Sequence, residues 1–139
     1  MIKVYTGGTF DLFHAGHVNF LSQCFQYGDV TVALNTDEFI EQFKGKKPVM
    51  KYWEREEVLR GCKYVDNVIP NISGQDSRPT ILSVKPHYII VGDDWEKKDY
   101  YKQMSFTKEW LEKYNIKLIY VPYTVGISTT EIKNRLSQL

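Results

Sequence analysis

The sequence predicts a single doubly wound α/β domain that spans residues 1–139 and is built on a parallel sheet. Short apolar runs rich in β-branched residues alternate with longer amphipathic stretches along the chain. Strands separated by helices require crossover connections, which produce a parallel sheet with helices on both faces. A length of 139 residues suits one such domain, and no internal repeat, low-complexity tract or linker divides it.

Apolar runs are predicted as strands, and amphipathic segments between them as helices. The predicted strands cover 2–6, 30–34, 65–69, 88–91 and 118–121. The predicted helices cover 18–27, 53–61, a segment around 81–82 that ends before Pro86, 106–114, and a C-terminal segment that Ser128 opens. The lysine-rich segment 42–50 is predicted to be a mobile loop. In sheets of this class, ligands bind beyond the carboxyl ends of the strands.

Charge and composition exclude several classes of partner. The formal net charge is +1, so bulk electrostatics favour binding to neither nucleic acid nor membranes. The two cysteines, Cys24 and Cys62, match no zinc or redox spacing. The first residues lead directly into a predicted strand without a signal peptide, and the apolar runs are too short to span a bilayer. A cytoplasmic protein is therefore expected.

The segment 7–17, with the sequence GGTFDLFHAGH, directly follows the first predicted strand. Its glycines let a ligand approach the backbone closely, and Thr9 with the following amides can donate to phosphate oxygens. His14 and His17 are three residues apart at the start of a helix, so both rings can face one point. Because a helix N-terminus favours anions, two imidazoles there form a donor pair for charge that develops on a phosphate during transfer.

Two alternatives exist for this histidine pair. A purely structural role is disfavoured because two of the three histidines of the chain lie in one glycine-bracketed turn. Zinc binding is the stronger alternative, since imidazole is a good zinc ligand, but no cysteine or further histidine lies nearby to complete a ligand shell. The phosphate interpretation is favoured, and no metal site built from protein side chains is predicted.

Two further polar segments follow predicted strands. In 126–131, GISTTE, a serine or threonine followed by glutamate predicts a helix capping box, and its hydroxyls and free amides also form an anion site. In 92–95, GDDW, the acidic pair could hold a metal or cap a helix. Trp95 could stack on a base or cover the core, and it follows a strand end where this fold binds nucleotides.

The segment 8–17, GTFDLFHAGH, resembles the HxGH nucleotidyltransferase superfamily. HxGH alone marks only the superfamily, but its combination with GDDW and GISTT resembles the glycerol-3-phosphate cytidylyltransferases. The similarity covers nearly the whole chain, with the motifs in the same order. It implies a Rossmann-like nucleotidyltransferase fold.

The resemblance also implies roles for individual residues. Catalytic roles fall to His14, His17, Lys44 and Lys46. The nucleotide-binding set is Gly8, Thr9, Phe10, Asp11, Gly92, Asp94, Trp95, Thr124, Gly126, Ile127, Ser128 and Thr129. The acceptor would contact Lys44, Lys46 and Arg55. For Asp11 a structural role in the turn is an equal alternative, Arg55 could form a structural ion pair, and a lysine run is usually solvated surface.

By the same resemblance, the implied substrates are CTP and a phosphorylated small alcohol, with glycerol 3-phosphate first. The implied cofactor is Mg²⁺ held mainly by the CTP phosphates, and the implied assembly is a homodimer. Alternatives are another phosphorylated polyol or amino alcohol as acceptor, an adenylyltransferase that uses ATP, and a non-catalytic nucleotide-binding module. The pair His14 and His17 disfavours the last of these.

Two positions depart from the family pattern. Tyr123 stands where the family usually has arginine, and Lys63 stands where arginine is frequent. Tyrosine cannot make the bidentate phosphate contact of arginine. The departures bear on substrate binding and leave the transferase class unchanged.

Overall fold

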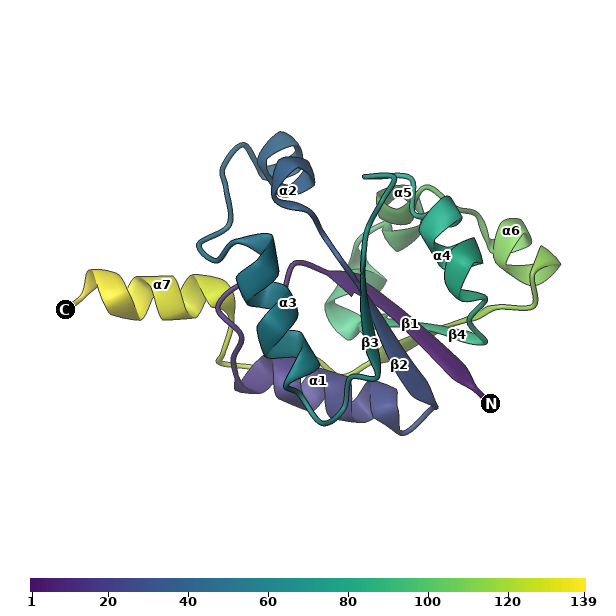
Figure 1. The fold of residues 1–139 in the computed structure, drawn as a ribbon, viewed down its shortest axis with the longest axis horizontal. Helices are drawn as coiled ribbons and strands as arrows, with labels where there is room; N and C mark the ends of the chain where they lie inside the picture. The colour runs from purple at the N-terminus through teal and green to yellow at the C-terminus, as the bar shows by residue number, and fades with distance from the viewer.

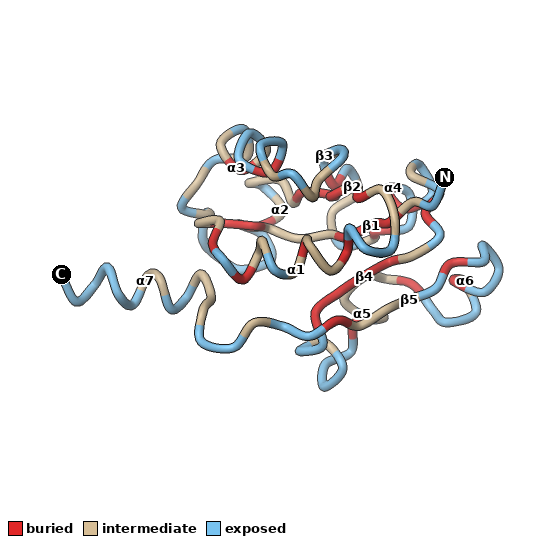
Figure 2. Tube along the Cα trace, turned by 90° about the horizontal axis from the view of Figure 1, so that it is seen from below, coloured by how far each residue is buried: buried red, intermediate tan, exposed pale blue.

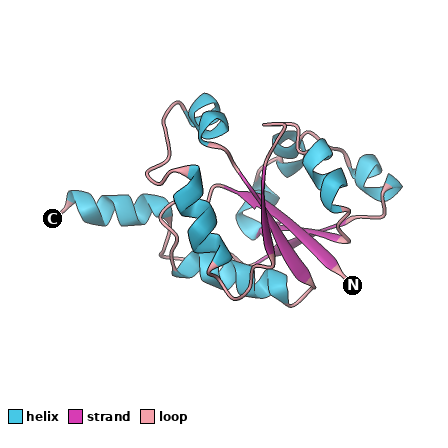
Figure 3. Cartoon of the chain, in the orientation of Figure 1, coloured by secondary structure: helices cyan, strands magenta, loops and turns pink.

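The computed structural model describes all residues 1–139 and contains one parallel sheet flanked by helices (Figures 1 and 3). The strands are β1 (Lys3–Gly8), β2 (Asp29–Leu34), β3 (Asn67–Pro70), β4 (Tyr88–Gly92) and β5 (Lys117–Val121). Their order across the sheet is β3-β2-β1-β4-β5, and all four neighbouring pairs are parallel. The predicted doubly wound α/β fold is confirmed.

Seven α-helices and one 3-10 helix connect or follow these strands. They are α1 (Ala15–Phe25), α2 (Asp37–Lys44), α3 (Tyr52–Arg60), α4 (Arg78–Val84), η1 (Asp93–Lys97), α5 (Tyr100–Met104), α6 (Lys108–Lys113) and α7 (Thr129–Ser137). α7 projects from the body of the domain and buries none of its residues (Figures 1 and 2). No helix has both the length and the apolar character that crossing a membrane requires.

The core has two halves, one on each face of the sheet. Alternate residues of a strand point to opposite faces, so Val4 and Tyr5 of β1 fall into different halves. On one face, Val4 shares a cluster with Leu21 of α1 and Leu59 of α3. On the other face, residues of α4, α5 and α6 pack beside Tyr5. Helices therefore cover both faces, and the buried trace in Figure 2 follows the strands between them.

The chain reverses its direction of travel across the sheet at β1. Strand β2 lies on one side of β1, and β4, reached after β3, lies on the other side. Such a switch point opens a crevice at the carboxyl ends of the strands, because the flanking connections leave in opposite directions. The loop after Gly8 begins in this crevice.

The segment 42–50 was predicted as a loop, and residues 45–50 are one, but residues 42–44 are helical. Residues 42–44 form the last turn of α2, which the sequence interpretation missed. The Thr36 hydroxyl accepts the Phe39 amide at its start, and the Gly45 amide donates to the Glu41 carbonyl at its end. Phe39, Ile40 and Phe43 give this helix an apolar face, so a helical pattern was present in the sequence and was overlooked. Helices η1 and α5 were also not predicted; five residues each are too short for a periodic pattern.

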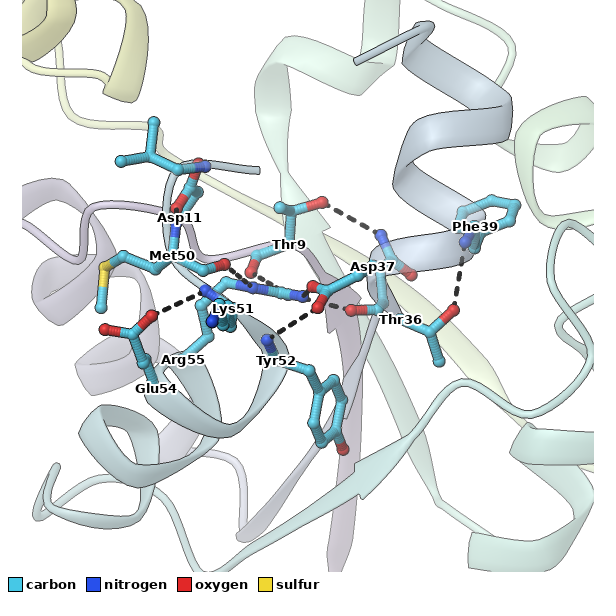
Figure 4. Close-up of polar contacts among 12 residues, drawn as sticks. Thr9, Asp11, Thr36, Asp37, Phe39, Met50, Lys51, Tyr52, Glu54 and Arg55 are labelled. Atoms are coloured by element: carbon cyan, nitrogen blue, oxygen red, sulfur yellow. Dashed lines mark hydrogen bonds and ion pairs between the residues drawn. The ribbon is translucent and has the colours of Figure 1, made fainter. Parts of the chain in front are cut away.

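A buried arginine joins the ends of the central strands to two helices (Figure 4). The side chain of Arg55, on α3, is fully inaccessible and lies 2.6 Å from the Asp37 carboxylate on α2. Its guanidinium also donates to the carbonyls of Thr9 at 2.9 Å, Asn35 at 2.9 Å and Met50 at 3.0 Å. Four of its five N–H groups are therefore engaged, and the loops after β1 and β2 are tied to the start of α3.

Replacing Arg55 should destabilise the fold strongly. In Arg55→Met, three carbonyls and the Asp37 carboxylate lose their donor, so we expect a loss of about 3 kcal/mol in the free energy of unfolding. Arg60→Met on the same helix is the control, because Arg60 pairs with Glu56 at the surface, and it should cost about 1 kcal/mol or less. Urea unfolding followed by circular dichroism measures both, and equal small losses would contradict the central role of Arg55.

Candidate functional site

A cavity of about 560 Å³ lies at the carboxyl end of the sheet, beside the loop that follows β1. Residues from the β1–α1 loop, from α2 and the segment after it, from η1 and from α7 line it. Nine of the predicted site residues are at its wall: Gly8, Thr9, Phe10, Asp11, His17, Lys44, Lys46, Trp95 and Thr129. Segments that are far apart in the sequence thus form one site.

The two motif histidines stack at the N-terminus of α1. Their ring centroids are 3.8 Å apart with an interplanar angle of 24°. The Nδ1 atom of His14 accepts the Gly16 amide at 3.1 Å, and Nδ1 of His17 accepts the His14 amide at 3.1 Å. Because both Nδ1 atoms accept, both neutral rings carry their proton on Nε2. The local backbone therefore sets the tautomer of both histidines.

The Nε2 atom of His14 is buried and has no hydrogen-bond partner. A buried donor without a partner costs about 1–3 kcal/mol, which an acceptor such as a phosphate oxygen would offset. Burial lowers the pKa of both histidines, to about 3 for His17, where the neighbouring His14 lowers it further and Asp11 opposes the shift. Both rings are therefore neutral donors near pH 7; His17 lines the cavity, whereas His14 lies buried against His17 outside the cavity lining.

Gly16 is required by the close approach of His14. A Cβ atom at this position would lie 2.9 Å from Cε1 of His14 and 3.3 Å from Cγ2 of Ile127. Any side chain would displace the histidine from the helix N-terminus, because contacts this short do not occur between carbon atoms in relaxed structures. The HAGH spacing is thus dictated by packing as well as by chemistry.

Asp11 is hydrogen-bonded to the loop before α3. Its carboxylate accepts the amides of Val49 at 2.7 Å and Met50 at 2.9 Å, and the side chain is buried (Figure 4). Its carbonyl accepts the Thr129 hydroxyl at 2.8 Å. Although Asp11 touches the cavity, these contacts support the structural alternative for its side chain. It restrains the end of the lysine segment and the start of α7.

Four lysines line one side of the cavity: Lys44, Lys46, Lys47 and Lys133. None of them forms a salt bridge. The pKa of Lys44 is lowered by burial first and then by Lys133 and Lys46, while Asp11 opposes the shift. Ammonium groups that form no salt bridge and gather at one cavity make a site for a multiply charged anion.

The wall on the β4 side carries aromatic residues. Trp95 is half-buried, packs edge-on against Tyr100 and lines the cavity with it. A Cβ at Gly92 would lie 2.6 Å from the Asp94 carboxylate and 3.2 Å from the Tyr123 ring, so Gly92 makes room for both. Asp94 itself does not line the cavity, whereas Tyr123 does. Burial and then Asp94 raise the pKa of Tyr123 above its ordinary value, so its hydroxyl is neutral near pH 7.

The segment from Thr124 to Ser128 lies outside the cavity lining, and three of its residues contact α1 or cap α7. The Thr124 hydroxyl accepts from Asn19, and Ile127 packs against Gly16. The Ser128 hydroxyl accepts the Glu131 amide at 3.0 Å, which confirms Ser128 as the helix cap but gives only the Ser128 half of the predicted capping box. Thr124, Gly126, Ile127 and Ser128 do not line the cavity, while Thr129 and Thr130 do.

The predicted acceptor contact of Arg55 is not supported by the geometry. Its side chain is fully buried behind the cavity and its guanidinium is held by Asp37 and three carbonyls. The ion-pair alternative describes its environment. The sequence could not separate the two roles, because a motif arginine next to an acidic pair is compatible with both.

Several residues at the cavity wall were missed from the sequence. Asn35 and Asn71 directly follow β2 and β3, and polar residues after buried strands are a signal that could have found them. Lys133 lies four residues after Thr129, on the same face of a predicted helix. Gln103 had no signal, because α5 was not predicted. No group of three or more His, Cys, Asp or Glu side chains is arranged to hold a metal ion.

Comparison with known families identifies this arrangement. The family described as Cytidylyltransferase-like matches residues 5–135. The chain belongs to this family. The matched range includes the β1–α1 loop with both histidines and the start of α7.

Individual relatives agree with this membership. The chain is 40% identical to glycerol-3-phosphate cytidylyltransferase of Bacillus subtilis (strain 168) over 140 residues, which covers 100% of both chains. It is 36% identical to an FAD synthase of Thermococcus sibiricus over 125 residues, covering 88% of this chain and 81% of the relative. The solved lipopolysaccharide core biosynthesis protein of Thermoplasma volcanium is similar in structure, with a TM-score of 0.65, 27% identity and coverage of 89% and 99%.

The depressed pKa of His17 predicts how stability depends on pH. Folded His17 stays neutral down to about pH 3, whereas in the unfolded chain it takes up a proton below about pH 6.5. The unfolded state binds more protons between these values, so stability falls as the pH is lowered through this window. Between pH 7 and pH 5 the wild type should lose about 2 kcal/mol more than His17→Asn, which keeps an acceptor for the His14 amide. Urea unfolding at both pH values tests this, and parallel losses would contradict a depressed pKa.

Proposed function

We propose that this protein transfers the cytidylyl group of CTP to glycerol 3-phosphate and forms CDP-glycerol and pyrophosphate. The observation that carries the proposal is the pair of neutral histidines at the N-terminus of α1, which lies beside a lysine-rich cavity. The full-length similarity to a glycerol-3-phosphate cytidylyltransferase supports the choice of substrates.

The reaction needs no general base. An oxygen of the acceptor phosphate, already ionised near pH 7, attacks the α-phosphorus of CTP and forms the new P–O bond. The bond from the α-phosphorus to the oxygen that bridges it to the β-phosphorus breaks in line, and pyrophosphate leaves with that electron pair. Catalysis then consists of positioning the two anions and stabilising charge in the transition state.

The histidines suit the stabilising role. Both donate from Nε2, because backbone amides occupy Nδ1. Both stay neutral, so no proton is lost or gained when the phosphate charge is redistributed. His14 offers a donor that is buried and has no partner within the protein. In this proposal both donors act on the α-phosphate oxygens.

The rest of the cavity divides between the two substrates. The triphosphate would lie on the amides after Gly8, on Thr9 and on the start of α7, where a capped helix N-terminus favours anions. Trp95 would lie near the cytosine. Lys44 and Lys46 would hold the acceptor phosphate, and Lys133 would add charge near the triphosphate, where Tyr123 supplies none.

We also propose Mg²⁺ as cofactor, a homodimer as the assembly and the cytoplasm as location. Side chains alone offer no metal cage, so the ion would be held by the triphosphate and water. When bound, it would neutralise triphosphate charge. The homodimer is proposed by analogy, and analytical ultracentrifugation of the purified chain tests it.

A coupled assay for pyrophosphate tests the proposed function. With Mg²⁺ and CTP, glycerol 3-phosphate should give the highest kcat/KM among glycerol 2-phosphate, phosphorylated polyols and phosphoethanolamine. Titration calorimetry should show tighter binding of CTP than of ATP. Higher turnover with ATP would indicate an adenylyltransferase instead, and binding without turnover of any acceptor would indicate a nucleotide-binding module.

Loss of either histidine should abolish most activity while the fold is kept. His14→Ala and His17→Ala each remove one transition-state donor, so kcat should fall roughly a hundredfold or more. Steady-state rates measure this, and thermal melts establish that each variant is folded. Near-normal turnover in a folded variant would refute the role of that histidine.

Lys46 should affect the acceptor more than the nucleotide. It lies after the last turn of α2 at the cavity wall, so Lys46→Ala should raise KM for glycerol 3-phosphate more than KM for CTP. Each constant is measured with the other substrate saturating, and Lys108→Ala, on α6 outside the cavity lining, is the control. A rise confined to CTP would assign Lys46 to the triphosphate.

A further inference from the structure

A chain of side-chain hydrogen bonds runs from α4 to the cavity through two asparagines. The Thr80 hydroxyl donates to Oδ1 of Asn71 at 3.4 Å, and Nδ2 of Asn71 donates to Oδ1 of Asn35 at 3.2 Å. Nδ2 of Asn35 donates in turn to the hydroxyl oxygen of Thr9 at 3.2 Å. Thr9, Asn35 and Asn71 all line the cavity, and Thr80 is buried.

The direction of this chain is set by a backbone carbonyl. Nδ2 of Asn71 also lies 2.9 Å from the carbonyl oxygen of Gly74, which can only accept. The opposite orientation of the Asn71 amide would place two oxygens at that distance. Gly74 presents this carbonyl from a left-handed turn with φ of 62°, a conformation that favours glycine. A backbone carbonyl that is not part of this side-chain hydrogen-bond network therefore fixes the orientation of the Asn71 amide.

The orientation of the Asn71 amide determines that of the Asn35 amide, which in turn determines how the Thr9 hydroxyl is used. Because Asn71 presents a donor, Asn35 must turn its oxygen toward Asn71 and its nitrogen toward Thr9. The Thr9 oxygen then accepts, so its own hydrogen must point elsewhere. The backbones are held as well, since Nη1 of Arg55 donates to the carbonyls of both Thr9 and Asn35.

We propose that Asn35 and Asn71 are positioning residues that make the Thr9 hydroxyl a fixed donor to the triphosphate. The inference rests on the proposed function for the identity of the ligand. Asn35 occupies an acceptor lone pair of Thr9, which leaves the hydroxyl hydrogen for the cavity. A pre-oriented donor gains affinity because no rotation has to be frozen when the anion binds.

A double-mutant cycle between Thr9 and Asn35 tests this coupling. Thr9→Val removes the hydroxyl with little change of volume, whereas Thr9→Ser keeps it and should bind CTP nearly as the wild type does. Asn35→Asp keeps the contact with Asn71 but presents only acceptors to Thr9, which would turn its hydrogen away from the cavity. The dissociation constants of CTP and of inorganic tripolyphosphate are measured by calorimetry for each variant and for the double variant.

We expect Thr9→Val and Asn35→Asp each to weaken CTP binding roughly tenfold to a hundredfold, the range for a hydrogen bond to a charged group. In the Thr9→Val background, Asn35→Asp should have a clearly smaller effect, because the hydroxyl through which it acts is gone. Gln103→Glu is the charge control. It adds a carboxylate to the cavity wall without contact to Thr9, so its effect should be equal in both backgrounds.

Asn71→Ala tests the same coupling without adding a charge. It releases the Asn35 amide from the fixed orientation, so it should weaken CTP binding in the wild type and have a clearly smaller effect in the Thr9→Val background. Thermal melts identify any variant that fails to fold, and the remaining arm then decides. Equal effects of Asn35→Asp or Asn71→Ala in both backgrounds would overturn the proposal, as would wild-type affinity in Thr9→Val.

Tripolyphosphate separates this inference from the proposed function. If the coupling is seen with tripolyphosphate but the wild type makes no CDP-glycerol, the orientation of Thr9 stands and the cytidylyl transfer fails. If CDP-glycerol is formed but neither ligand shows coupling, the transfer stands and the positioning role fails.

Discussion

The buried guanidinium of Arg55 holds together the parts of the domain from which the site is built. It contacts the carbonyls after β1 and β2, the carbonyl before α3 and the carboxylate at the start of α2 (Figure 4). These groups lie on separate loops, which are also joined by the hydrogen bonds of Asn35 with Thr9, of Asp11 with Met50 and of Asp37 with Tyr52. A buried guanidinium is tolerated only while all of its hydrogen-bond partners are in place. The positions of these partner groups are therefore tightly restrained. The position of Thr9 and the path of the chain into the histidine turn both depend on it.

A nearly neutral protein can still build a strong anion site, because the charge is assembled locally. The net charge is +1, yet four lysines that form no salt bridge face one cavity. Neutral histidines and a capped helix N-terminus contribute donors without adding net charge. Uncharged donors bind a phosphate less tightly in the ground state than a further cation would, so less of the interaction is spent before the transition state.

The turn that carries the histidines is under backbone strain. Phe10 and Leu12 both have φ of 50°, in the left-handed region that costs a non-glycine residue roughly 1–2 kcal/mol. Asp11, between them, uses both carboxylate oxygens on the amides of Val49 and Met50, and its carbonyl accepts the Thr129 hydroxyl. The two strained residues are thus fixed by contacts from the lysine segment and from α7. This turn therefore contacts both the lysine-rich segment 42–50 and the start of α7.

Local patterns in the sequence were sufficient for the strands, most helices, the Ser128 cap and the histidine pair, because each depends on neighbours within a few residues. Helices η1 and α5 were not accessible in this way, since five residues are too few for a periodic pattern, whereas α2 has an apolar face and was overlooked beside the lysine-rich segment. The role of Arg55 was decided only by tertiary structure, because its partners at Thr9 and Asn35 are 46 and 20 residues away. The same holds for Lys133, Asn35 and Asn71. A polar side chain belongs to the cavity only when the fold brings its strand end or helix face there, and that depends on packing between elements that no local pattern encodes.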